Sequence, residues 1–420
     1  MGISKKTLKT GKAHRPQRWE TVVTERLRVE NLCKVFSKSP EPALRMLAAG
    51  AKKSEVLTKT GMVVGLNDVS LSVQSGAIYM VMGLSGSGKS TLARCINRLN
   101  EPSAGRILLD GQDIVAAGEA ELRDIRRTRI SMVFQHFALL PNRTVAENAE
   151  FGLKLQGVSP QVRRRRAEEV LSIVGLARWG NHYPHELSGG MRQRVGLARA
   201  LATDADVLIM DEAFSALDPL IRTEMQDELL RLQRTLKKTI LFITHDFQEA
   251  LKLGTRIAIM ADGELVREGT PQSIVLDPGS DYVAAFTREV DRSRLFDARS
   301  AMSPVQPVPL TAGLCLAETG DGGGLVLDDG GHVVGVLDAE TLRGLREGKP
   351  YGDANFGTLR KDFVTVRECD SLLDAARAHR AGRPMAVVDE EGRLTGTLAG
   401  DRILAGIASA PPHPAGGLHA

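Results

Sequence analysis

The feature that most constrains the fold is a glycine-rich segment between an apolar run and a stretch suited to a helix. Residues 78–82 are all apolar, and residues 83–91 are Gly-Leu-Ser-Gly-Ser-Gly-Lys-Ser-Thr. This order fits the phosphate-binding pattern G-x-x-x-x-G-K-[ST], whose glycines let backbone N–H groups turn inward. A helix that begins near Lys89 would add the partial positive charge of its N-terminus. We therefore predict a strand–loop–helix unit that binds nucleotide phosphates.

The pattern assigns a role to each part of this loop. Backbone N–H groups would enclose the phosphate oxygens, Lys89 would reach the β- and γ-phosphates, and the Ser90 hydroxyl would coordinate Mg²⁺. A Gly/Ser-rich loop can also be a plain connection, but here the strand before it and the helix after it supply the required context. The candidate nucleotide-binding residues of the loop are Gly83, Ser85, Gly86, Ser87, Gly88, Lys89, Ser90 and Thr91.

A second apolar run, residues 207–210, ends in two carboxylates, Asp211 and Glu212. A buried strand with this ending would place Asp211 beside the metal ion and Glu212 where it can polarise an attacking water molecule. Alone, the pair could be two solvated acids at the end of a core strand. Together with the upstream loop, it predicts phosphoryl chemistry rather than binding alone.

A third feature is the segment Leu187–Arg194, in which Ser188, Gly189 and Gly190 open a helix. Its N–H groups would form a second anion-binding set. One chain cannot bring both sets to one γ-phosphate, so two copies would be needed. The segment resembles the LSGGQ signature of ABC ATPases, with Met191 where glutamine is commonest.

The remaining sequence motifs of the ABC ATPase family follow in the expected order. Gln135 resembles the Q-loop glutamine, which the resemblance places at Mg²⁺ and the attacking water. Asp218 resembles the D-loop aspartate that acts across the dimer, and His245 resembles the switch histidine near the γ-phosphate. Phe36 resembles the aromatic residue that stacks on adenine, where tyrosine is commoner. The resemblance implies ATP and Mg²⁺ as cofactors and a homodimer that closes around ATP.

Beyond a break at 287–305, which we interpret as a linker or a domain start, the chain repeats a pattern. Apolar runs at 324–327 and 385–388 are each followed by an acidic turn and a second run, about 60 residues apart. The two units resemble a tandem pair of CBS modules. The first is degenerate, with little room for its helix between Thr311 and Gly324, and neither ends in the Gly-x-x-[Ser/Thr]-x-x-Asp typical of modules that bind adenosine nucleotides.

At 420 residues the chain is too long for one ordinary core. Alternating strand and helix patterns predict an α/β fold with a largely parallel sheet. The resemblances imply that this fold is a P-loop NTPase of the ABC ATPase type, followed by an α+β CBS pair. We predict a basic flexible tail at 1–24, the ATPase domain at 25–290 with a helical insertion at 37–61 and a helical subdomain at about 117–190, the CBS-like region at 300–408, and a disordered tail at 409–420.

The helical insertion and the text around the phosphate-binding loop are similar to those of glycine betaine/proline betaine import ATPases. That resemblance implies ATP-powered uptake of a quaternary amine osmoprotectant, with integral membrane permease subunits and an extracytoplasmic substrate-binding protein as partners. It places the chain peripherally at the cytoplasmic face of the inner membrane. Residues 301–420 carry a net charge of −5 and the remainder +9, so their attraction would weaken as salt rises. A solvated acidic face is the alternative to gating by ionic strength.

The sequence leaves other functions of the chain open. The same ATPase could serve an importer of choline or an amino acid. Soluble ABC ATPases usually carry two cassettes or a long coiled coil, and this chain has one phosphate-binding loop and no sustained heptads. A regulator without turnover is opposed by the presence of both Glu212 and His245.

Composition limits the kinds of partner that the chain is expected to bind. No apolar run approaches the ~18 residues of a membrane-spanning helix, and the four cysteines have no metal-ligand spacing. The first twenty residues hold six Lys or Arg against one Glu, which we interpret as a solvated tail with no nucleic-acid role. Contact of that tail with anionic lipid headgroups is an alternative for a chain docked at a membrane.

Overall fold

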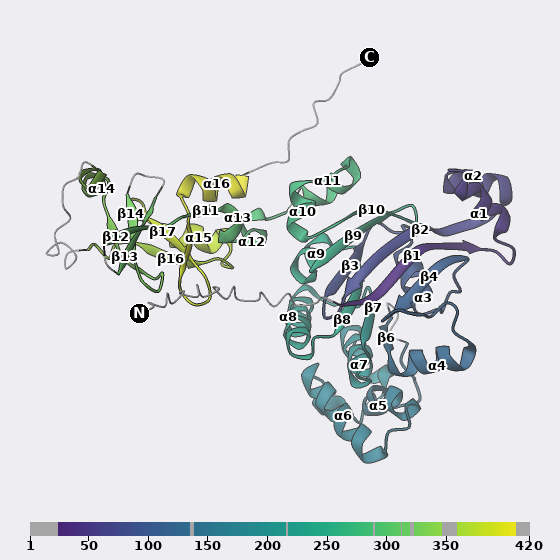
Figure 1. Cartoon of the computed structure of the whole chain (residues 1–420). Coiled ribbons are helices and arrows are strands. Elements are labelled where there is room, and N and C mark those ends of the chain that lie inside the picture. The colour runs from purple at the N-terminus through teal and green to yellow at the C-terminus, as the bar shows by residue number, and fades with distance from the viewer. Residues whose placement is uncertain are drawn as a thin grey trace, which may run out of the picture.

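The computed structural model describes residues 24–134, 138–215, 217–288, 290–311, 313–319, 323–346 and 359–408 (Figure 1). The predicted tails at 1–24 and 409–420 lie outside these residues, apart from Thr24, so both stay predictions. In this part of the chain no helix combines the length and apolar character needed to cross a lipid bilayer.

A six-stranded sheet forms the centre of the first domain, in the order β10-β9-β3-β8-β7-β6. All neighbours are parallel except the edge pair β10–β9. Strands β3, β7 and β8 are buried along their whole length, because helices or a second sheet cover both faces. The strands are β3 Ile78–Met82, β6 Ile130–Val133, β7 Val207–Asp211, β8 Thr239–Thr244, β9 Arg256–Ala261 and β10 Glu264–Gly269.

A four-stranded antiparallel sheet, ordered β2-β1-β4-β5, packs on one face of the central sheet. Side chains of β3 alternate between the two cores: Tyr79 and Val81 face this second sheet, whereas Met80 faces the helices on the other side. Its strands are β1 Glu25–Phe36, β2 Val63–Gln74, β4 Ala104–Leu109 and β5 Gln112–Asp113.

The insertion between β1 and β2 consists of two short helices, α1 Glu41–Ala48 and α2 Lys53–Thr60, as predicted. Gly50 has φ +85°, a left-handed conformation that glycine adopts without a steric penalty, and it separates the two helices. A small core of its own holds the insertion against β1 and β2, formed by Val35, Ala43, Leu47, Val56 and Val64.

Helices of the first domain mostly follow the prediction, with one correction. The region predicted as a helical subdomain, about 117–190, is mostly helical, but Ile130–Val133 forms β6 and pairs with β7 at the sheet edge. Four residues are too few to carry a strand periodicity. The helices are α3 Lys89–Ile96, α4 Glu119–Thr128, α5 Val145–Leu155, α6 Pro160–Ile173, α7 Gly189–Ala202, α8 Pro219–Leu236, α9 Phe247–Leu253, α10 Pro271–Leu276 and α11 Asp281–Thr287.

The stretch 287–305, predicted as a linker or a domain start, contains structure of the C-terminal region. Its elements are α12 Arg292–Leu295, α13 Ala298–Ala301 and β11 Ser303–Pro304. Strand β11 pairs with β18, and α12 and α13 contact α15 and α16. Of the two alternatives, a linker or a domain start, the structure supports a domain start over most of this stretch.

The C-terminal region has two four-stranded sheets, ordered β12-β13-β14-β15 and β11-β18-β17-β16. The repeated runs at 324–327 and 385–388 lie in equivalent strands, β14 and β17. Where the second unit has a strand and a helix, the first has the hairpin β12–β13. The elements are β12 Val308–Thr311, β13 Leu314–Glu318, β14 Gly324–Asp328, β15 Val333–Leu337, α14 Ala339–Arg346, β16 Val364–Arg367, α15 Leu372–Ala378, β17 Met385–Val388, β18 Leu394–Thr397 and α16 Gly400–Ala408.

The two units pack against each other through the sheets. Leu325 and Leu327 of the first unit share a buried cluster with Ala386 of the second. The two acidic turns lie side by side, since Leu394 N–H donates to the Gly331 carbonyl (2.9 Å). The repeat therefore forms one body with two halves.

Candidate nucleotide-binding site

The glycine-rich loop connects β3 to α3 at the carboxyl edge of the central sheet. Gly83 has φ +152°, and a Cβ atom there would overlap the carbonyl oxygen of Met260. Gly88 has φ +102°, and its Cβ would lie 2.7 Å from the carbonyl oxygen of Gly65. Glycine is required at both positions because the loop curls tightly against neighbouring backbone.

Lys89 lies inside the curl and is only 5% exposed. Its Nζ donates to the carbonyl oxygens of Gly83 (2.8 Å) and Leu84 (2.9 Å). Burial lowers the pKa of Lys89, and the nearby carboxylates of Glu212 and Asp211 oppose that shift. The loop thus holds a cation among inward backbone groups, which suits a polyphosphate.

Asp211 and Ser90 meet across the site. The Ser90 hydroxyl donates to Oδ1 of Asp211 (2.9 Å), because β7 and β3 flank β8 and end at the same edge. Burial raises the pKa of Asp211, and the Ser90 hydrogen bond lowers it. A hydroxyl and a carboxylate side by side are oxygen ligands of the kind Mg²⁺ prefers. The third predicted ligand, Gln135, lies outside the described residues.

Glu212 and His245 form the next pair. Glu212 follows β7 in a left-handed conformation (φ +48°), uncommon for a residue with a side chain, and its N–H donates to the Ile243 carbonyl of β8 (3.0 Å). His245 Nδ1 lies 3.4 Å from Oε2 of Glu212. The Glu212 side chain is 16% exposed and that of His245 59%, so the carboxylate lies deep and the imidazole faces outward. The pair can orient a water molecule at a phosphate.

The Ser-Gly-Gly segment begins α7, as predicted. Ser188 is the N-cap, and its Oγ accepts from the Met191 N–H (3.3 Å). Among hydrogen bonds and ion pairs between described residues, none joins Ser188, Gly189 or Gly190 to the glycine-rich loop. Farther along the helix, Gln193 is buried and donates to the Glu212 carbonyl (3.4 Å). Helix α7 is thus linked to Glu212 through Gln193.

Asp218 and Phe36 lie at the margins of the site. Asp218 is exposed and caps α8, accepting from the Ile221 N–H (3.1 Å). Phe36 ends β1 and is 48% exposed, with Lys34 Nζ 5.2 Å from the ring centroid. A Cβ on Gly65 would touch both Phe36 and Thr91, so the ring lies next to the first turn of α3. The ring of Phe36 is therefore open to solvent beside the phosphate-binding unit, and its stacking on adenine stays a prediction.

Two residues that hold the phosphate-binding loop in place were not found from the sequence. Gly65 provides the backbone against which Gly88 packs. The hydroxyl of Tyr282, on α11, accepts from the Leu84 N–H (3.3 Å) and donates to the Met260 carbonyl (3.2 Å). Neither residue belongs to a motif, and Tyr282 is nearly 200 positions from the loop, so no local signal marks it.

The loop with its buried lysine, the two consecutive carboxylates at the end of β7 and the second helix that begins with Ser-Gly-Gly define an ATPase of the ATP-binding-cassette class. The family model described as "ABC transporter" matches residues 66–215. The glycine betaine/proline betaine transport ATP-binding protein ProV of Salmonella typhimurium is 45% identical over 385 residues, 89% of this chain and 95% of its own. The glycine betaine transport ATP-binding protein OpuAA of Bacillus subtilis is 45% identical over 91% of this chain and 92% of its own.

Solved structures agree with this class. The ATP-binding cassette MJ0796, in a dimeric post-hydrolysis state bound to ADP and Pi, is 32% identical, with a TM-score of 0.51 over 58% of this chain and 98% of that one. The chain belongs to the family of ABC transporter ATP-binding subunits, which confirms the resemblance seen in the sequence. It is an ATP-binding protein whose hydrolysis of ATP is coupled to transport.

Proposed function

We propose that the chain powers an importer of glycine betaine, proline betaine or a related quaternary amine. The observation that carries this proposal is likeness over nearly the whole length: 45% identity to ProV across 95% of that protein. The choline transport ATP-binding protein OpuBA of Bacillus subtilis is 37% identical over 79% of this chain. A choline importer is therefore the second candidate.

The site geometry supports a separate role for each of these residues in ATP hydrolysis. Lys89 would exchange its bonds to the Gly83 and Leu84 carbonyls for the β- and γ-phosphate oxygens of ATP. Ser90 and Asp211 would hold Mg²⁺, which neutralises charge on the phosphates when bound. Glu212 would accept a hydrogen bond from the attacking water, and His245, 3.4 Å from that carboxylate, would lie near the γ-phosphate. Gln135 is proposed as a further ligand.

Two copies are needed for the second anion-binding helix to act. Because Ser188–Gly190 makes no hydrogen bond to the loop of its own chain among the described residues, its donors are proposed to serve a nucleotide on a partner copy. Asp218 would act across the same interface, and the dimeric state of the similar cassette supports this assembly. Phosphate charge would then be fully surrounded only in the closed dimer, so ATP favours closure.

A groove beside β6 supports a permease partner. It has a volume of about 280 Å³ and combines aromatic walls, Phe134 and Phe151, with the cations Arg126, Arg127 and Arg199. A short helix of a membrane protein, apolar on one face and acidic at one end, matches that lining. We propose that permease subunits dock here, with an extracytoplasmic substrate-binding protein on the far side of the membrane.

This assembly would hold the chain peripherally at the cytoplasmic face of the inner membrane. Contact of the basic residues 1–24 with anionic headgroups would add to that attachment. The C-terminal CBS-like region is proposed to gate transport by ionic strength. The chain's distribution of charge, −5 in residues 301–420 and +9 elsewhere, supports that proposal.

Uptake of radiolabelled glycine betaine into vesicles that carry the reconstituted complex tests the function. We expect ATP-dependent uptake that varies with salt and is displaced by proline betaine. Glu212→Gln should retain ATP binding and lose hydrolysis about 10²- to 10⁴-fold. Glu224→Gln is a matched control, since Glu224 is an exposed carboxylate 3.9 Å from Arg194. Choline flux without betaine flux would favour the second candidate, and unchanged turnover in Glu212→Gln would remove that residue from its role.

A further inference from the structure

One hydroxyl joins the glycine-rich loop to the last helix of the cassette. Tyr282 lies on α11, and its oxygen accepts from the Leu84 N–H (3.3 Å) while its proton goes to the Met260 carbonyl (3.2 Å). The same Met260 oxygen is the atom that Gly83 packs against. The first turn of the loop is thus pinned to β9 through a side chain from outside the motif.

The Gly83–Leu84 turn is held from two sides. Lys89 binds its carbonyl oxygens from inside the curl, and Tyr282 binds its N–H from outside. Phosphate would compete with the carbonyls for Lys89, because an ammonium binds an anion more strongly than a neutral oxygen. The Leu84 N–H, by contrast, already donates to the Tyr282 hydroxyl, which comes from a helix outside the motif. The Tyr282 bond is therefore the one that persists when Lys89 changes partner.

Helix α11 also contacts the element that follows the switch histidine. Tyr282 packs edge-on against Phe286 (centroids 5.3 Å apart), and Phe286 lies 6.2 Å from Phe247, the first residue of α9. His245 precedes Phe247 by two positions. Aromatic contacts of this kind are specific in geometry. One short helix thus contacts both sides of the nucleotide site.

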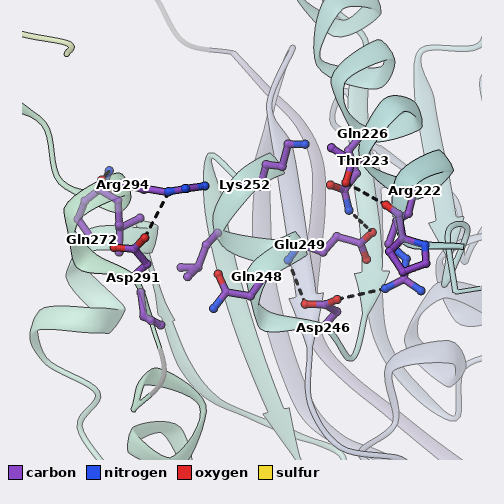
Figure 2. Close-up of a pocket in the computed structure, with 14 residues that line it drawn as sticks. Arg222, Thr223, Gln226, Asp246, Gln248, Glu249, Lys252, Gln272, Asp291 and Arg294 are labelled. Atoms are coloured by element: carbon purple, nitrogen blue, oxygen red, sulfur yellow. Dashed lines mark hydrogen bonds and ion pairs between the residues drawn. The ribbon is translucent and has the colours of Figure 1, made fainter. Parts of the chain in front are cut away.

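The chain that continues from α11 borders a cavity. Val290, Asp291 and Arg294 line one side of a cavity of about 610 Å³, and α8 and α9 line the other with polar side chains such as Arg222 and Lys252 (Figure 2). Figure 2 shows the Asp291–Arg294 pair across the space from the Arg222–Asp246 pair. Val290 and Leu295 pack against the buried core, while the open space beside them leaves room for the charged side chains of Asp291 and Arg294 to move. Figure 1 shows α11 on the side of the cassette toward the C-terminal region.

We propose that Tyr282 is a positioning residue for the phosphate-binding loop. Its hydroxyl holds the first turn ready for phosphate, and through it α11 links nucleotide occupancy to the segment that opens the C-terminal region. The inference rests on the proposed function in that the loop binds ATP. It adds a residue outside the motifs and a route between the loop and the C-terminal region.

Tyr282→Phe in the full-length chain removes the hydroxyl and keeps the ring against Phe286. Tyr183→Phe is the matched control, because Tyr183 is 41% exposed and lies away from the loop in sequence. Binding of a fluorescent ADP analogue, steady-state ATPase rates and hydrogen exchange would be measured for both. For Tyr282→Phe we expect Kd and KM for nucleotide to rise about 3- to 10-fold, the effect of one lost neutral hydrogen bond, with kcat within about two-fold.

Hydrogen exchange gives a readout that a structural role would not change. In the wild type, nucleotide should slow exchange in residues 83–88 and 281–288 together; in Tyr282→Phe the response of 281–288 should be lost. Wild-type affinity and exchange in this variant would overturn the inference. An equal loss in Tyr183→Phe, or a lowered Tm that accounts for the weaker binding, would also overturn it. An inactive wild type would instead sink the proposed function.

Discussion

Asn148 is the most informative position for testing how the helical subdomain is held beside the site. It lies on α5 with no exposed surface. Its Oδ1 accepts from the Leu140 N–H (2.8 Å), and its Nδ2 lies within 3.1 Å of the carbonyl oxygens of Leu140, Arg143 and Thr144. The side chain therefore closes the loop that leads from the predicted Q-loop into α5.

The number of hydrogen bonds that the Asn148 side chain can form at one time sets the expected loss in the free energy of unfolding. An amide nitrogen has two hydrogens, so two of the three carbonyls can be served at a time, and the oxygen adds a third bond. At about 1 kcal/mol for each neutral bond, Asn148→Ala should lower the free energy of unfolding by about 3 kcal/mol. Asn148→Asp should cost at least as much at pH 7, since a carboxylate cannot donate and would face carbonyl oxygens. The Asp variant separates hydrogen bonding from lost volume.

Urea unfolding followed by tryptophan fluorescence would measure the effect. The chain has two tryptophans, and Trp179 lies in the helical subdomain, so a Trp19→Phe background makes the signal local. Asn142→Ala, at an exposed position of the same loop, is the control and should shift the free energy by less than about 0.5 kcal/mol. Equal shifts in Asn148→Ala and Asn142→Ala would refute the reasoning.

Three further predictions concern the loop, a buried acid and the aromatic platform. Gly83→Ala should abolish ATP binding (more than about 100-fold in Kd), because its Cβ would overlap the Met260 carbonyl, whereas Gly118→Ala, with open space, should bind normally in the same fluorescence titration. Burial raises the pKa of Glu249, so the folded state keeps the carboxyl proton at pH values above 4.5 and the free energy of unfolding falls as the pH rises. Glu249→Gln should therefore have a higher Tm than the wild type at pH 8 and the same Tm near pH 4.5. A higher Tm for the wild type at pH 8 would contradict this. Phe36→Ala should raise KM for ATP about 5- to 100-fold through lost stacking while leaving inorganic triphosphate binding unchanged; a parallel loss of triphosphate binding would exclude a base platform.

Local signals predicted most of the cassette. Residues 78–91 carry strand, loop and helix in one uninterrupted pattern, so the phosphate-binding unit was visible in the sequence. Strands Ile130–Val133 and Ser303–Pro304 were missed because they are short and are fixed by partners distant in the chain, β7 and β18. Tyr282 was missed for the same reason, since its contacts with the loop arise only from the fold. The degenerate first repeat, by contrast, could be predicted, because too few residues lie between Thr311 and Gly324 to form the expected helix. Leu314–Glu318 forms a strand there.

The pairing of β11 with β18 has a consequence for how the chain matures during synthesis. Ser303 leaves the ribosome roughly 90 residues before its partner Thr397, with the whole first unit in between. The sheet β11-β18-β17-β16 therefore cannot be completed until the last strand of the chain, β18, has been made. A nascent chain halted between the two units would leave β11 without its strand partner, and the apolar side chains of Phe296 and Ala298 without part of the core that buries them. Such an intermediate is the stage at which we expect this protein to need a chaperone most.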